Sequence, residues 1–199
     1  MRSLTVLRVR AIHPSTPRRS VTKEQDHQPK PLTLEHVAQT ATDVLLARGV
    51  HFPTLVVEGS QHATIREVSD LAATHEGRLR QLFAAGFVLA SSGVLGDLKQ
   101  IFFITEAWVS TAPPDQLKST IVPSEDPARK EALVVSHLDA QTNEARIILR
   151  EMIRDADGHL TEIRALHEDD QRAGRRLDSP LLQAFASGYA TGRSGGKPT

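Results

Sequence analysis

The chain has 199 residues, with 24 basic and 24 acidic side chains and no cysteine. This length suits one domain with a full core. The balanced charge gives no global field that would draw the protein to nucleic acid or an acidic membrane. The lack of cysteine excludes disulfides, thiolate zinc sites and a cysteine nucleophile. Apolar windows fall short of the roughly 20 residues of a membrane helix. We therefore expect a cytoplasmic protein with no membrane or nucleic-acid partner.

The two ends of the chain differ in composition from its middle. Residues 1–23 contain six basic residues and no acid, and the segment that follows is rich in proline and polar residues. Such a segment buries too little apolar surface to offset the entropy of ordering, so residues 1–32 are predicted to be a disordered basic tail. A transit peptide is the alternative for this bias. Residues 33–190 are predicted to form one domain, and 191–199 a flexible tail.

The first ordered elements are predicted to be a helix, a hairpin and a second helix. Thr33 is a plausible N-cap for a helix with apolar residues at helical spacing, and Gly49 ends it. A strand over residues 54–58 and a returning strand around Ile65 form a hairpin, although a short helix is the alternative for the second segment. Thr74 is predicted to cap a helix that runs to about residue 90.

The C-terminal half has the pattern of a β-meander. Four apolar segments follow one another, "QIFFITEAWVS", "EALVVSHL", "ARIILREMI" and "HLTEIRAL", with turn-forming residues between them. The pair Asp157-Gly158 predicts a hairpin with a type I′ turn. A last apolar segment, "SPLLQAFASGY", is predicted to form a helix that packs back on the domain. The fold class is therefore α+β, a mainly antiparallel sheet with about two main helices packed on one face.

Motifs for catalysis, metal binding and nucleotide binding are absent or incomplete. The tail "GGKP" lacks the first glycine and the Ser or Thr of a phosphate loop. "DADG" lacks the third acid and the final glutamate of a calcium loop. The nine histidines include no pair at the spacing of a zinc site. The sequence thus predicts neither a metal nor a cofactor.

One charged segment remains as a candidate site. Glu106 and Trp108 lie at the end of an apolar strand, and a Pro-bounded polar segment containing Glu125 and Asp126 follows, with Arg129 next to it. The candidate acid–base and anion-binding groups are Glu106, Glu125, Asp126 and Arg129. Two further residues are candidate binding residues, namely Trp108 and Lys130. The alternative is a structural ion pair of Glu106 with one of the arginines on the neighbouring strands, because most charge clusters pair without catalysing.

Two functions from different classes follow from this sequence. The first is a non-catalytic interaction or structural module that binds an unknown protein partner or associates with itself as a homo-oligomer. The second is a hydrolase with a carboxylate and arginine site near Glu106 and Arg129. The first is favoured because every catalytic pattern that we tested is incomplete.

Overall fold

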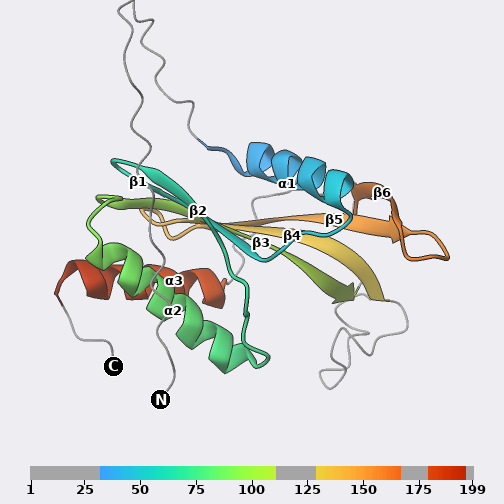
Figure 1. Ribbon diagram of the computed structural model, residues 1–199. Coiled ribbons are helices and arrows are strands. Elements are labelled where there is room, and N and C mark those ends of the chain that lie inside the picture. Colours follow the sequence, from blue (N-terminus) through green and yellow to red (C-terminus); the bar gives the residue numbers. More distant parts are fainter. Residues whose placement is uncertain (1–31, 111–128, 167–178, 196–199) are drawn as a thin grey trace, which may run out of the picture. The chain divides into compact units, whose positions relative to one another are not determined.

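The computed structural model describes residues 32–110, 129–166 and 179–195, which belong to one compact unit (Figure 1). In chain order the elements are α1 (Leu34–Arg48), β1 (Thr54–Gly59), β2 (Ala63–Glu67), α2 (His75–Ser91), β3 (Leu98–Ser110), β4 (Arg129–Asp139), β5 (Ala145–Arg154), β6 (Leu160–Ala165) and α3 (Pro180–Arg193). The predicted basic tail lies outside the described residues except for Leu32. Helix α3 continues past residue 190, where the sequence predicts the domain to end.

The strands form one antiparallel sheet in the order β2-β1-β3-β4-β5-β6. This arrangement confirms the predicted α+β class with a mainly antiparallel sheet. The meander β3 to β6 is followed by α3, so it lies in the middle of the described part of the chain rather than at its end. The hairpin of β1 and β2 is confirmed as well, with Val56 opposite Ile65.

Local signals define the ends of the first two helices. The Thr33 hydroxyl accepts a hydrogen bond from the backbone N–H of His36, and Gly49 ends α1 in the left-handed conformation with φ 73°. Thr74 caps α2 in the same way, by accepting from the N–H of Gly77. Each cap satisfies a backbone group that the helix itself leaves unpaired.

The β5–β6 turn lies where the sequence predicts it, but its type differs. Gly158 has φ 83°, whereas Asp157 does not have a positive φ. A type I′ turn requires positive φ at both central residues, so the prediction of that type is wrong. The N–H of Gly158 donates to the carbonyl of Asp155 at 3.0 Å, as in a three-residue loop whose last residue is a left-handed glycine. Two Asp155 side-chain hydrogen bonds, to the N–H groups of Asp157 and His159, support this longer loop.

Helices cover both faces of the sheet (Figure 1). Neighbouring residues of β3 point to opposite faces: Phe102 packs with α1, and Phe103 packs with α2 and α3. The structure thus refines the predicted placement of the helices, since α1 and α2 lie on opposite faces. The reason is that β3 is apolar on both faces, and each face must be removed from water.

The helix pair α2 and α3 packs with close backbone contact. A Cβ atom added at Gly188 would lie 2.0 Å from the carbonyl oxygen of Phe83, and one added at Gly86 would lie 2.1 Å from that of Phe185. Glycine is therefore required at both positions, because any larger residue would force the helices apart. Tyr189 adds a hydrogen bond from its buried hydroxyl to the carbonyl of Gly96 at 2.6 Å.

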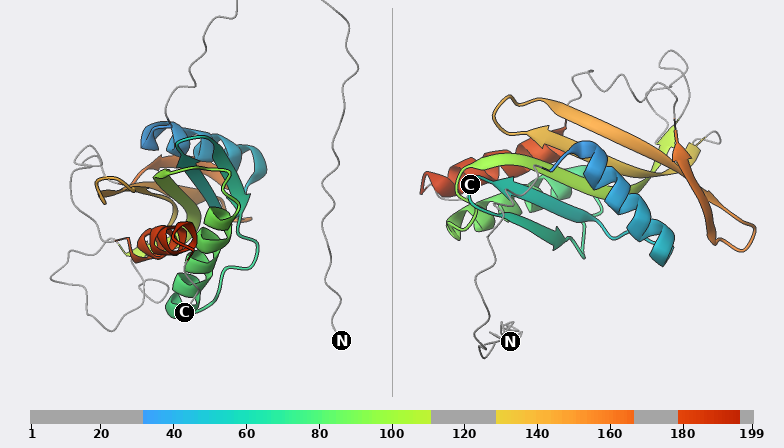
Figure 2. Two further views of the ribbon diagram at one scale, coloured as in Figure 1. Left: turned by 90° about the vertical axis from the view of Figure 1, so that its left-hand side faces the viewer. Right: turned by 90° about the horizontal axis from the view of Figure 1, so that it is seen from above.

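Helix α1 covers only part of its face. In the view from above, the β1–β2 hairpin lies to one side of α1 (Figure 2). The apolar core beneath α1 draws on β1, β3, β4 and β5. The face of the β1–β2 hairpin is thus left beside the helix rather than under it.

Candidate functional site

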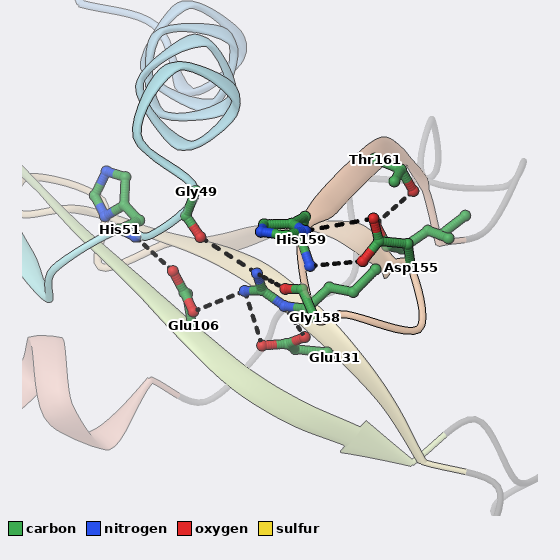
Figure 3. Close-up of polar contacts among 10 residues, drawn as sticks. Gly49, His51, Glu106, Glu131, Asp155, Gly158, His159 and Thr161 are labelled. Atoms are coloured by element: carbon green, nitrogen blue, oxygen red, sulfur yellow. Dashed lines mark hydrogen bonds and ion pairs between the residues drawn. The ribbon is translucent and has the colours of Figure 1, made fainter.

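Glu106, the central residue of the predicted site, lies in an ion-pair cluster at the C-terminal end of α1 (Figure 3). One carboxylate oxygen accepts the backbone N–H of His51 at 2.5 Å, and the other lies 3.7 Å from a guanidinium nitrogen of Arg154. The Glu106 side chain is 22% exposed. The carboxylate is therefore half-buried, with a partner for each oxygen.

Arg154, at the end of β5, contacts four other parts of the chain at this cluster. It forms a two-bond pair with Glu131, at 2.7 Å and 3.2 Å, and it donates to the carbonyls of Gly49 and Gly158 at 3.3 Å each. The contact with Glu106 is the longer, purely electrostatic one. Hydrogen bonding to Glu131 is the main reason why the pKa of Arg154 is raised above its ordinary value. One guanidinium thus connects the end of α1, strands β3 and β4, and the β5–β6 turn.

This geometry gives Glu106 and Arg154 a positioning role. The segment that leaves α1 is held at Gly49 by Arg154 and at His51 by Glu106. His51 is buried, and its imidazole Nδ1 is 2.8 Å from the carbonyl of Phe52. The cluster therefore fixes the backbone from Gly49 to Phe52 against the sheet.

The other predicted site residues do not join Glu106. Trp108 lies at the far end of β3, with the guanidinium of Arg129 4.6 Å from its ring centre. Arg129 pairs with Ser110 in the β3–β4 register, four residues beyond Glu106, which corresponds to about 13 Å along the strand. The backbone positions of Glu106 and Arg129 are thus well separated along the sheet. Trp108 is 46% exposed, so it is not a core residue.

Lys130 belongs to a separate ion-pair group on the other face of the sheet. It lies 3.0 Å from Glu151, which also pairs with Arg164 at 2.9 Å. The hydrogen bond from Arg164 is the largest cause of the lowered pKa of Glu151, and Lys130 adds to it. The remaining two candidates, Glu125 and Asp126, lie outside the described residues.

A groove of about 550 Å³ lies between α1 and the β1–β2 hairpin. The fifteen residues that line it are Leu32, His36, Val37, Thr40, Ala41, Val44, Arg48, Val50, His51, Phe52, Thr54, Val56, Ile65, Glu67 and Ile104. Its floor is buried and apolar, as shown by Val56 and Ile104 at 7% and 4% exposed. Its rim is exposed and mixed: the apolar side chains of Ile65 and Phe52 are 72% and 52% exposed, and exposed polar residues such as Arg48 and Glu67 also line it. We call this feature the α1–β2 groove.

The α1–β2 groove and the Glu106 cluster share one segment. Val50, His51 and Phe52 form one end of the groove, and the backbone of this segment is held by Glu106 and Arg154. None of the predicted site residues in the described part of the chain lines the groove. Sequence reasoning missed it because Ile65, Val50 and Phe52 are single apolar residues in polar surroundings. The only available signal was the pair Val50 and Phe52 directly after the helix-ending Gly49.

A second polar cluster holds the N-terminal end of α1. The side chain of Gln100 donates to Glu58 at 2.6 Å and to the carbonyl of Leu32 at 2.9 Å. Its oxygen lies 2.9 Å from Nε2 of His137, whose ring stacks on Phe102. Because an amide oxygen only accepts, His137 is protonated on Nε2. Burial is the main cause of the lowered pKa of His137.

Among the described residues, one group has the spacing of metal ligands. It consists of Asp155, Asp157 and His159, all exposed, in the β5–β6 turn (Figure 3). One Asp155 oxygen already accepts two backbone N–H groups of the turn. This group is therefore explained by the turn itself.

Comparison of the chain with protein-family models, with curated proteins and with solved structures found no match. In the described part of the chain, every helix is too short or too polar to cross a membrane.

Proposed function

We propose that the protein is a non-catalytic interaction module that binds a short segment of a partner protein in the α1–β2 groove. The observation that carries this proposal is a groove with a buried apolar floor and two large apolar side chains, Ile65 and Phe52, exposed at its rim. Ile65 is the most exposed large apolar side chain among the described residues, and Phe52 lies across the same groove. Contiguous exposed apolar surface of this kind is typical of interaction sites.

The size of the groove favours a short segment as the occupant. Fifteen residues line it, fewer than the roughly 20 to 30 residues that each partner contributes to a protein interface of standard size. Self-association as a homo-oligomer, the other expectation from the sequence, has less support for this reason. A cytoplasmic location is part of the proposal, because a chain of 199 residues without cysteine suits a reducing compartment.

The hydrolase with a site near Glu106 and Arg129 has weaker support. The Glu106 carboxylate is held by the His51 N–H and by Arg154, which suits a structural partner. Arg129 lies over the Trp108 ring, and its backbone is four residues along the strand from the position opposite Glu106. The hydrolase alternative predicts that Glu106→Gln abolishes turnover of ester or phosphoester substrates while the fold stays intact.

Panning of a phage-displayed peptide library against the full chain tests the interaction module. We expect enriched peptides whose affinity falls roughly tenfold or more for Ile65→Asp, because a charge then replaces the apolar rim. Val88→Asp is the matched control, because Val88 is 62% exposed but lies on α2, on the other face of the sheet. Failure to enrich any peptide, or peptides equally tolerant of both substitutions, would contradict the proposal.

A further inference from the structure

Strand β2 is an edge strand of the sheet in the described part of the chain. The β1–β2 hairpin continues beyond its strands with hydrogen bonds from Gly59 to His62 and from Val68 to Pro53. In an antiparallel pair the residues that bond to the partner strand alternate, and each one directs both its N–H and its C=O to the same side. His62 and Val68 direct these groups to β1, as do the even-numbered residues between them.

The odd-numbered residues of β2 therefore direct their backbone groups away from β1. These residues are Ala63, Ile65 and Glu67, and their side chains lie on the face that carries α1, because Ile65 and Glu67 line the groove. A strand placed along this edge could form hydrogen bonds with all three residues. Its alternate side chains would then lie next to Ile65, at the rim of the groove.

We infer that the partner segment binds in an extended conformation and adds to the sheet as a strand along β2, antiparallel to it. This inference depends on the proposed function and specifies its binding mode. Main-chain hydrogen bonds supply affinity in such complexes, and the alternate side chains supply specificity. An acyl chain or another apolar small molecule would leave the backbone groups of Ala63, Ile65 and Glu67 to water.

Charge on β2 specifies the segment further. The side chains of Arg66 and Glu67 are both exposed and have no hydrogen-bond or ion-pair partner among the described residues. Opposite charges directly across two strands stabilise the pairing. The segment that fits therefore has, from its N-terminus, a basic residue opposite Glu67, an acidic residue opposite Arg66 and an apolar residue opposite Ile65.

The same charges disfavour a second copy of this chain as the occupant. An antiparallel pair of two β2 strands centred on Ile65 would place Glu67 opposite Ala63 and Arg66 opposite Thr64. Neither charge would meet an opposite charge. The pairing would also be limited to a strand of five residues. The complementary partner segment satisfies both charges, which is why we favour it.

A synthetic peptide with the sequence Ser-Lys-Glu-Ile-Thr-Val-Ser tests the binding mode, with fluorescence anisotropy on the full chain as the readout. We expect measurable binding, and a loss of roughly tenfold or more when the amide nitrogen of the peptide isoleucine is methylated, because this N–H faces the carbonyl of Ile65. The matched control carries the methyl group on the amide nitrogen of the peptide glutamate. That N–H points away from β2, so binding should persist.

A charge exchange tests the register. Glu67→Lys should weaken binding of the peptide, and a peptide with glutamate in place of its lysine should restore it. Restored binding supports the inferred register, since a general loss of structure would not be rescued by the peptide. Equal binding of both peptides by Glu67→Lys would contradict the register and with it the inference.

Failure of the inference is distinguishable from failure of the proposed function. Peptides that require Ile65 but tolerate methylation at both positions equally would overturn strand addition and leave the interaction module standing. A dimer of the free chain in light scattering, abolished by Ile65→Asp, would show that a second copy occupies β2 and would also overturn the inference. Absence of any peptide that depends on Ile65 overturns both.

Discussion

The two faces of the sheet are built differently. On one face α2 and α3 pack so closely that Gly86 and Gly188 have no room for a side chain, and the buried core beneath them includes Phe103 and Phe185. On the other face α1 lies alone, held at its ends by polar clusters around Gln100 and Arg154, with the α1–β2 groove beside it. The comparison shows that both faces have a buried core, but only the second keeps an apolar groove beside its helix.

The largest expected effect is on the α2–α3 face. Gly188→Val should destabilise the protein by about 3 kcal/mol or more, because the added side chain collides with the backbone of α2 and the helices must separate. Chemical denaturation of the variant measures this. Ser187→Ala, an exposed neighbour on the same helix, is the control and should stay within about 0.5 kcal/mol of the parent. A stable Gly188→Val protein would show that the two faces do not differ as described.

The next effect concerns the polar cluster on the α1 face. Arg154→Ala should cost about 2–3 kcal/mol, since two half-buried carboxylates, Glu106 and Glu131, lose their shared counter-charge. Arg164→Ala is the comparison and should destabilise the protein much less than Arg154→Ala, because Arg164 is exposed and Glu151 keeps Lys130. Urea titration of both variants checks the order. Equal losses would mean that the cluster at α1 is no more than a surface ion pair.

A smaller effect is expected at the end of the β3–β4 hairpin. Trp108→Ala should cost about 1 kcal/mol, well below the 3–5 kcal/mol of a core tryptophan, because the ring is 46% exposed and its described cation–π contact is with Arg129. A thermal melt of this variant, interpreted beside that of Phe103→Ala, measures the difference. A loss as large as that of Phe103→Ala would place the tryptophan in a core.

The smallest effect depends on pH. Burial lowers the pKa of His137 below its ordinary value of 6.5, so the unfolded chain binds more protons than the folded one in the range just below 6.5. Stability should therefore fall as the pH drops through that range. His137→Asn should remove this part of the dependence. Urea titrations between about pH 5 and 7.5 measure this dependence. Carboxylates with a lowered pKa, such as Glu35, bind protons below this pH range. Parallel profiles of the two proteins would contradict the assignment to His137.

Elements with strong local signals could be predicted from the sequence. Thr33 and Gly49 define α1, and alternating apolar residues define the strands, because caps and periodicity act within a few residues. The turn type at Gly158 was mispredicted because Asp155 binds two backbone N–H groups of a longer loop, which competes with the two-residue turn.

The candidate site was less predictable than the fold. Glu106 was correctly expected to be near arginines of the neighbouring strands, but its pairing with Arg154 depends on how β3, β4 and β5 align. The α1–β2 groove depends on where α1 lies across the sheet. It is formed by residues such as Val37, Phe52 and Ile65, which no local pattern brings together.

The close packing of α2 against α3 has a consequence for folding during synthesis. Helix α3 follows β6 in the chain, so the ribosome produces it after all six strands of the sheet, whereas the core under α1 needs no residue beyond β6. Until α3 emerges, Leu82 and Phe103 lack Phe185, which closes their side of the sheet. The nascent chain thus passes through an interval in which one side is assembled and the other is open to aggregation or to chaperone binding.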